Sequence, residues 1–305
     1  MNKTDEKLLE NIIDKDVFKA DAYNIRKNGE KIERKVNEYI DIVTKEDGTG
    51  IDVYVKENTP FAIINIPVII TESGIKDVVY NDFYIGKNAS VIIIAGCGIH
   101  NDGHKSSEHD GIHRFFVEEN AKVKYVEKHY AEGNGSGKNV LNPVTEVTLA
   151  KNATMNMDTV QIKGVDNTNR VTKALLKCGA NMVITEKILT DEHQEAKTDF
   201  SIELKGKDAK AHITSRAVAT ENSYQEFVSR VTGNNKCYAH VECDAIVMDN
   251  ASVKAIPEIY AKDVDAKLIH EATIGKIAGE QLIKLMSLGL SEKEAESTII
   301  KGFLS

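Results

Sequence analysis

A loose repeat of roughly 30 residues runs through the middle of the chain and restricts the fold more than any other feature. Segments such as KNASVIII (87–94), KNATMNMDTVQIKG (151–164) and KDAKAHITSRAVA (207–219) open on a polar or small residue and then alternate apolar and polar side chains. The repeat is marked by Ala89, Ala121, Ala153, Ala180, Ala209 and Ala239, at steps of 32, 32, 27, 29 and 30 residues. Alternation of this kind predicts half-buried strands.

Strand-rich units of this length predict a mainly β chain folded as a parallel β-helix, with its core over residues 46–270. In such a solenoid each coil buries its inward side chains against the next coil. A β-sandwich or jelly roll also has strands at short, regular spacing. The long period and the recurring Asn-Ala-x-Val opening favour the solenoid.

Both ends of the chain have a helical periodicity of apolar residues. Within residues 1–45 we expect two or three helices that cap the first coil, from the spacing of Leu8, Leu9, Ile12, Ile13, Ile25, Ile32, Val36 and Ile40. Within 271–305, GKIAGEQLIKLMSLG predicts one helix, and a Ser291–Glu294 capping box begins a second helix that ends near Phe303. This C-terminal segment is either a cap for the solenoid or a docking platform for a partner.

Charge and composition exclude several classes of protein. A net charge of −8 argues against a nucleic-acid-binding surface. The amphipathic N-terminus lacks the apolar centre of a signal peptide, and no apolar run is long enough for a membrane helix, so we expect a cytoplasmic protein without a membrane partner. The GNGSGKN segment at 133–139 lacks the Walker A spacing, so we expect no bound nucleotide. Four separated cysteines argue against a disulfide framework.

A histidine-rich segment, GCGIHNDGHKSSEHDGIH, covers residues 96–113. Its candidate metal ligands are Cys97, His100, His104, His109 and His113. Interrupting glycines predict a loop between strands rather than a helix. The loop could hold iron, zinc or copper, or its histidines could bond only to backbone and water. Glu127, His129 and Tyr130 could face the same groove from the next coil.

An alternative function is that of a metal-dependent β-helix enzyme acting on carbohydrate through the histidine-rich loop 97–113. A carbohydrate-binding groove needs aromatic platforms, however, and aromatic residues make up only 6% of the chain, with no tryptophan. A purely structural solenoid is the third possibility.

A second group of candidate ligands lies near the C-terminus. In AHVECDAIVMD, Cys243 shares one strand face with Ala239, Val241 and Ala245. In DAKLIHEATIGKI, His270 and Glu271 project to opposite faces if the segment is extended. A thiolate, an imidazole and a carboxylate that lie close together can hold iron, sulfide or a nascent cluster.

The run from Glu242 to Leu304, which contains HEATIGKI and the capped second helix, resembles the C-terminal signature of the SufB/SufD family of iron–sulfur cluster assembly scaffolds. The similarity is strong over 215–303 and extends more weakly from Ile64. The resemblance implies a right-handed β-helix with a helical C-terminal segment. It also implies that Cys243, His270 and Glu271 take part in assembling a transient, labile cluster where two protomers meet.

Partners follow from the same resemblance. It implies a non-catalytic scaffold that works with a SufC-like ABC ATPase, a sulfur donor and apo iron–sulfur client proteins. The expected ATPase contacts are Lys276, Ile277, Gln281, Leu282, Leu285 and Met286. Long family members have a glutamate where Ile269 stands here, so one potential ligand is missing. The chain looks like a compact, single-subunit version, for which we expect a homodimer through the C-terminal coils.

Overall fold

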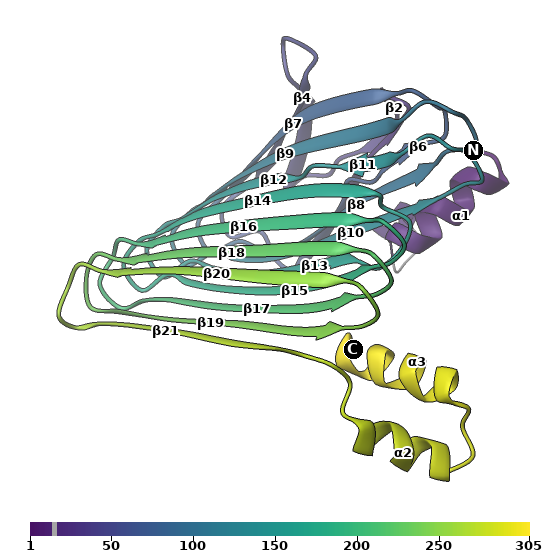
Figure 1. Ribbon diagram of the computed structural model, residues 1–305. Coiled ribbons are helices and arrows are strands. Elements are labelled where there is room, and N and C mark those ends of the chain that lie inside the picture. Colours follow the sequence, from purple (N-terminus) through teal and green to yellow (C-terminus); the bar gives the residue numbers. More distant parts are fainter. Residues whose placement is uncertain (14–16) are drawn as a thin grey trace.

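The computed structural model describes residues 1–13 and 17–305 and has the form of a β-solenoid of about 8 turns (Figure 1). Strands hold 57% of the residues, and the described ranges contain one α-helix at the N-terminal end and two at the C-terminal end. The expected solenoid is therefore confirmed. None of the helices in the described ranges is long and apolar enough to cross a membrane.

Successive strands of the solenoid alternate between two long sheets, so that each turn adds one strand to each sheet. The first sheet has the order β2 (Glu30–Lys35), β1 (Ala22–Lys27), β5 (Ala62–Asn65), β8 (Ser90–His100), β10 (Lys122–Glu132), β13 (Thr154–Gln161), β15 (Asn181–Thr190), β17 (Ala209–Ala219), β19 (Cys237–Val247) and β21 (Ala266–Gly275). The short strand β6 (Val68–Ile70) pairs with β1 and β8.

The second sheet has the order β3 (Ile40–Thr44), β4 (Gly50–Val55), β7 (Lys76–Ile85), β9 (Ser107–Val117), β11 (Asn139–Leu141), β14 (Asn167–Leu176), β16 (Glu195–Leu204), β18 (Tyr224–Gly233) and β20 (Ser252–Ala261). Strand β12 (Val144–Leu149) pairs with β9 and β14. Among the described strands the pairings are parallel except in the β1–β2 and β3–β4 hairpins, and side chains alternate between the closed interior and the outer surface.

The alanine markers of the repeat lie in one buried column for five of the six coils. The registers Ser90↔Lys122, Lys122↔Thr154 and Thr154↔Asn181 align the residues just before these strands, and all five alanines from Ala89 to Ala209 are 0% exposed. The sixth marker, Ala239, lies two residues beyond the column, because Ala209 aligns with Cys237 whereas Ala239 aligns with Ala211. A shift of two keeps a side chain on the same strand face, so the inward assignment still holds.

Turns at one corner of the solenoid carry a column of asparagines. Asn58, Asn88, Asn120 and Asn152 all have positive φ, between 56° and 60°. The amide of Asn88 donates to Oδ1 of Asn58 at 2.9 Å, that of Asn120 to Asn88 at 3.1 Å, and that of Asn152 to Asn120 at 3.4 Å. Asparagine tolerates the left-handed conformation, and its side chain links each turn to the next.

The N-terminal region is mostly strand, which contradicts the expected set of helices over residues 1–45. Among the described residues of this region only α1 (Lys3–Ile12) is an α-helix, and a 3₁₀ turn lies at Val17–Lys19. Strands β1 and β2 form an antiparallel hairpin whose turn, Asn28-Gly29, has φ of 50° and 84°. Asn-Gly with two positive φ values closes a tight hairpin, and that signal outweighs the apparent helical spacing of Ile25 and Ile32.

The C-terminal helices α2 (Gly279–Ser287) and α3 (Glu292–Phe303) form a pair that stands beside the end of the solenoid (Figure 1). The predicted Ser291–Glu294 capping box is present. Residues 271–275 still belong to β21, so the helical segment begins later than expected. The end of α3 contacts the outer face of β17, where Arg216 donates to the Phe303 carbonyl at 3.2 Å.

Candidate functional site

The C-terminal end of the solenoid is open, because β20 and β21 are the last strands of their sheets and no coil of the described residues covers them. Ile259 and Ile274 face the interior, since they pair with the buried residues Val231 and Ala245, yet they are 45% and 43% exposed. Tyr260, on the outer face of β20, is 61% exposed. Apolar interior surface is therefore uncovered at this end, in contrast to the buried middle coils.

Cys243 and His270 lie on the inward faces of neighbouring strands at this open end. His270 pairs with Val241, so it lies diagonally next to Cys243 across the β19–β21 ladder. Cys243 is fully buried, and burial raises the pKa of its thiol to about 12. Burial also lowers the pKa of His270, whose Nε2 has no hydrogen-bond partner among the described residues. The pair offers a protonated thiol beside a free imidazole nitrogen.

Glu271 lies on the opposite face of β21, as the alternation along the strand predicts. It pairs with Glu242 on the outer surface, and its side chain is 66% exposed. A single chain thus brings together two of the three predicted cluster ligands, Cys243 and His270, and keeps the third, Glu271, on the other face of the sheet.

The histidine-rich segment is divided between a turn and the solenoid interior. Only residues 101–106 form the expected loop, because β8 runs to His100 and β9 begins at Ser107. His100 and His104 lie at the rim, where His100 Nε2 is 2.9 Å from Asp102 Oδ2 and His104 Nδ1 is 2.9 Å from Ser136 Oγ. These two imidazoles have polar neighbours and do not converge with the buried ones.

His109 and His113 point inward with Cys97 toward an enclosed cavity of 20 Å³, about the size of one water molecule. Glu127 and His129 line the same cavity, as expected, whereas Tyr130 is directed away and bonds to Glu132. His109 Nδ1 lies 3.1 Å from Asp77 Oδ2, and His113 Nδ1 lies 2.7 Å from the Tyr125 hydroxyl. The cavity is too small and too enclosed for a polysaccharide, which removes the support for carbohydrate chemistry here.

A charged cluster inside the solenoid was not predicted from the sequence. Arg170 is fully buried and pairs with Glu127 on one side and with Glu186 on the other, the latter at 3.5 Å. Glu186 also accepts hydrogen bonds from Thr198 and Ser215 at 2.9 and 2.8 Å. Ser215 is the register neighbour of Cys243, so polar groups extend through the interior to the open end.

The charges in this cluster are mutually stabilised. Burial alone would raise the pKa of Glu127, but the Arg170 guanidinium and His129 outweigh it and hold that pKa at about 2. Burial lowers the pKa of His113 to about 4 and that of His129 to about 3, so both imidazoles are neutral at pH 7. In the part of the chain that the structure describes, no three His, Cys, Asp or Glu side chains are already gathered in metal-binding geometry.

Comparison with known proteins decides the family. The model of the SUF system FeS cluster assembly, SufBD core domain, matches residues 76–303, which is most of the solenoid and both C-terminal helices. The chain belongs to the SufBD family. An iron–sulfur cluster assembly SufBD family protein of Pyrococcus horikoshii is 30% identical over 268 residues, covering 85% of this chain and 78% of the relative. One of Methanocaldococcus jannaschii is 28% identical over 239 residues, covering 77% and 74%.

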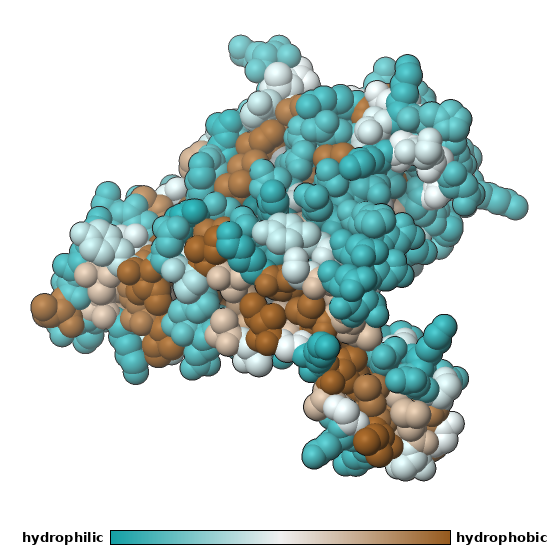
Figure 2. Space-filling view, in the orientation of Figure 1, coloured by the Kyte–Doolittle hydropathy of each residue, from teal (hydrophilic) through white to brown (hydrophobic). Residues whose placement is uncertain are grey.

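The helical pair of this SufBD family member exposes apolar side chains. Among the predicted ATPase contacts, Leu282 and Leu285 are partly buried, and Met286 is 43% exposed. Two residues that the prediction omitted are more exposed, Ile283 at 68% and Leu288 at 72%. Figure 2 shows apolar surface on this pair. The predicted contacts Lys276, Ile277 and Gln281 lie before and at the start of α2.

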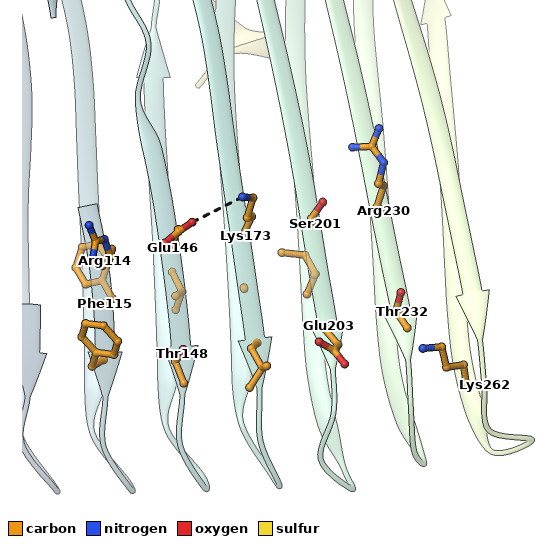
Figure 3. Close-up of a pocket in the computed structure, with 15 residues that line it drawn as sticks. Arg114, Phe115, Glu146, Thr148, Lys173, Ser201, Glu203, Arg230, Thr232 and Lys262 are labelled. Atoms are coloured by element: carbon orange, nitrogen blue, oxygen red, sulfur yellow. Dashed lines mark ion pairs between the residues drawn. The ribbon is translucent and has the colours of Figure 1, made fainter. Parts of the chain in front are cut away.

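The outer face of the second sheet carries a shallow groove of 610 Å³ in this SufBD family member (Figure 3). Its charged side chains largely neutralise one another: Lys173 lies 3.7 Å from Glu146, and Arg230 pairs with Asp199 and Glu258. None of the histidines or cysteines among the described residues lines it. The groove is thus a surface of ion pairs, separate from the candidate cluster ligands.

Proposed function

We propose that the protein is a cytoplasmic, non-catalytic scaffold subunit of a SUF-type assembly complex, which builds a nascent iron–sulfur cluster and transfers it to apo client proteins. Membership of the SufBD family carries this proposal, since every relative named above bears an iron–sulfur cluster assembly name. The cluster is cargo here, and its sulfur comes from a separate donor. Cys243, His270 and Glu271 are the proposed ligands.

A homodimer through the open end is the proposed assembly. The uncovered inward faces of β20 and β21, with Ile259 and Ile274 exposed, favour a second copy as the cover. A two-fold axis at these edge strands would bring two copies of Cys243 and His270 together and let an exposed Glu271 reach across from either protomer. The interface would then bring together the donors of Cys243, His270 and Glu271, which lie on two different sheet faces within one chain.

Opening of the site is required for chemistry, because a thiol with a pKa of about 12 stays protonated at pH 7 and the thiolate is the form that binds iron. Exposure or a nearby cation would lower that pKa. We assign the work of opening to a SufC-like ABC ATPase docked on α2 and α3, whose exposed Ile283, Met286 and Leu288 offer an apolar contact surface.

The experiment that tests cluster assembly is anaerobic reconstitution of the chain, co-expressed with its ATPase, using iron and sulfide. We expect a brown complex whose visible absorbance is lost in Cys243→Ser and reduced in His270→Ala. Cys237→Ser is the matched control, because Cys237 is a buried, inward residue of the same strand. A Cys243→Ser protein that assembles the cluster as well as Cys237→Ser does would overturn the assignment.

The docking surface is tested by co-purification of the ATPase with variants of the helical pair. Ile283→Lys and Leu288→Lys should each abolish co-purification, because a charge would be placed in an apolar contact. Ser297→Lys, a change at an exposed position of α3, should leave it intact. Loss in all three variants, or in none, would contradict docking through α2.

A further inference from the structure

Two histidines lie side by side on the outer face of the first sheet, on the face opposite to Cys243. His212 of β17 pairs with His240 of β19, and their ring centroids are 5.1 Å apart with an interplanar angle of 55°. The rings are therefore neither stacked nor in the edge-to-face arrangement. One row further along the sheet, Thr214, Glu242 and Glu271 are register neighbours across β17, β19 and β21.

The Nε2 atoms of both histidines are directed toward this second row. His212 Nε2 lies 3.2 Å from Thr214 Oγ1, and His240 Nε2 lies 3.4 Å from Glu271 Oε2. His240 Nε2 is buried and makes no hydrogen bond within the described part of the chain, so its contact with Glu271 is close but poorly aligned. A buried ring nitrogen without a partner costs free energy unless something else satisfies it.

The distances between these side chains agree with those between donors that bind the same metal ion. Two ligand atoms bound tetrahedrally at about 2.0–2.1 Å from one ion are about 3.3 Å apart, and the ring centroids of two such imidazoles are about 5 Å apart. The measured values are 3.4 Å for His240 Nε2 to Glu271 Oε2 and 5.1 Å for the centroids. Both distances therefore agree with a shared ion.

We propose that His212, His240 and Glu271 form a binding site for a divalent first-row transition metal ion, with Glu242 or water as the fourth donor. Two neutral imidazoles and a carboxylate suit Fe²⁺, Zn²⁺ or Co²⁺. The site is completed when Glu271, which is 66% exposed and already lies beside His240, changes rotamer so that its carboxylate also approaches His212. This movement is why the described side chains are not yet in metal-binding geometry.

The metal site goes beyond the proposed scaffold function and can stand without it. It uses no cysteine and lies outside the solenoid, whereas Cys243 and His270 face the interior. It also gives Glu271 a role within one chain, because its carboxylate lies on the opposite sheet face from Cys243 and cannot contact the thiol there. If clusters are built at the dimer interface, the outer site would present a metal ion next to that interface, on the same edge strand.

The test is titration of the isolated, metal-free protein with Co²⁺, followed by visible absorption. We expect binding of one Co²⁺ per chain with d–d bands and no thiolate-to-cobalt charge-transfer band. His212→Ala, His240→Ala and Glu271→Gln should each weaken binding about tenfold or more. Glu271→Gln removes charge from an exposed side chain, so it decides the question even if a histidine variant folds poorly.

Two control variants keep this outcome separate from that of the cluster assignment. Cys243→Ser should bind Co²⁺ as the parent protein does, because the thiol is on the other face. His193→Ala removes an exposed histidine in a distant turn and should also have no effect. Unchanged affinity in His240→Ala and Glu271→Gln, or a thiolate band that disappears in Cys243→Ser, would overturn the site.

Discussion

Arg170 is enclosed in the solenoid between the carboxylates of Glu127 and Glu186, and this single side chain joins three coils. Buried charges are tolerated only when they are paired and hydrogen-bonded, and here the threonine and serine hydroxyls complete the shell of Glu186. The cluster is therefore sensitive to the loss of any one member.

Arg170→Met should destabilise the fold by about 3–5 kcal/mol, because it leaves two buried carboxylates without their cation. Urea unfolding followed by circular dichroism measures the change. Arg114→Met is the control, since Arg114 is 39% exposed and its loss should cost less than about 1 kcal/mol. Similar losses for both arginines would mean that the buried ion pairs contribute little.

Stability should fall as the pH drops below about 6.5. His113 and His129 have pKa values lowered to about 4 and about 3 in the fold, against 6.5 when unfolded. Between these limits the unfolded chain binds protons that the folded chain does not, so each histidine removes about 1.4 kcal/mol per pH unit as the pH falls. The depressed pKa of Glu127 adds a further loss only below about 4.5.

Urea unfolding at pH 7 and pH 5 measures this dependence. His113→Gln and His129→Gln should each flatten it by about one proton, whereas His193→Ala, which removes an exposed imidazole, should leave the slope unchanged. A slope that is the same in all four proteins would show that the two buried histidines are not its source.

At the scale of elements, the turns that join the strands set the register of the coils. The asparagine column from Asn58 to Asn152 combines a left-handed backbone with side-chain hydrogen bonds between successive turns. Both contributions meet at Asn120, which donates to Asn88 and accepts from Asn152.

Asn120→Ala should lower the free energy of unfolding by about 2–4 kcal/mol, because it loses two hydrogen bonds and strains the left-handed turn. Asn120→Gly relieves the strain and should cost only the hydrogen bonds, about 1–2 kcal/mol. Chemical denaturation of both variants separates the two effects. Equal costs for Ala and Gly would rule out a contribution from backbone strain.

The alternation of apolar and polar residues predicts which side chains face inward, but it does not predict which of these side chains contact one another. The pattern grouped Cys243 with Ala239, Val241 and Ala245 and put His270 and Glu271 on opposite faces, but it did not indicate which of these two shares the face of Cys243. The Arg170 cluster was missed because inward polar residues look like breaks in the apolar pattern, and their partners lie 16 to 43 positions away. The β1–β2 hairpin replaces the expected helices because Asn28 and Gly29 both adopt positive φ and close a tight turn, which the spacing of apolar residues does not reveal.

At the scale of the whole molecule, the solenoid is a stack in which each coil contacts mainly its neighbours. The interior is covered at its N-terminal end, where Ile40 and Ile42 of the edge strand β3 are buried, and α1 packs nearby through Leu8 and Ile12 on the outer face of β8, against Gly96 and Gly98. The C-terminal end has no such cover, and there Ile259 and Ile274 remain exposed. The two ends should therefore differ in local stability.

Hydrogen exchange should be fastest in β20 and β21 at low protein concentration and should slow as the concentration rises, if a second copy covers this end. Exchange in β13 and β15 should not depend on concentration. Ile259→Lys should remove the dependence in β20 and β21 without changing the central strands. Concentration-independent exchange in the parent protein would contradict the homodimer.

Only residues 276–278 connect β21 to the helical pair. A bound protein that displaced α2 and α3 would therefore pull on β21. This edge strand is hydrogen-bonded along one side only, to β19, so its hydrogen bonds can break one after another. His270 and Glu271 both lie on that strand. Tension on the helices would therefore move His270 relative to Cys243 inside the solenoid and Glu271 relative to His240 on the outer face.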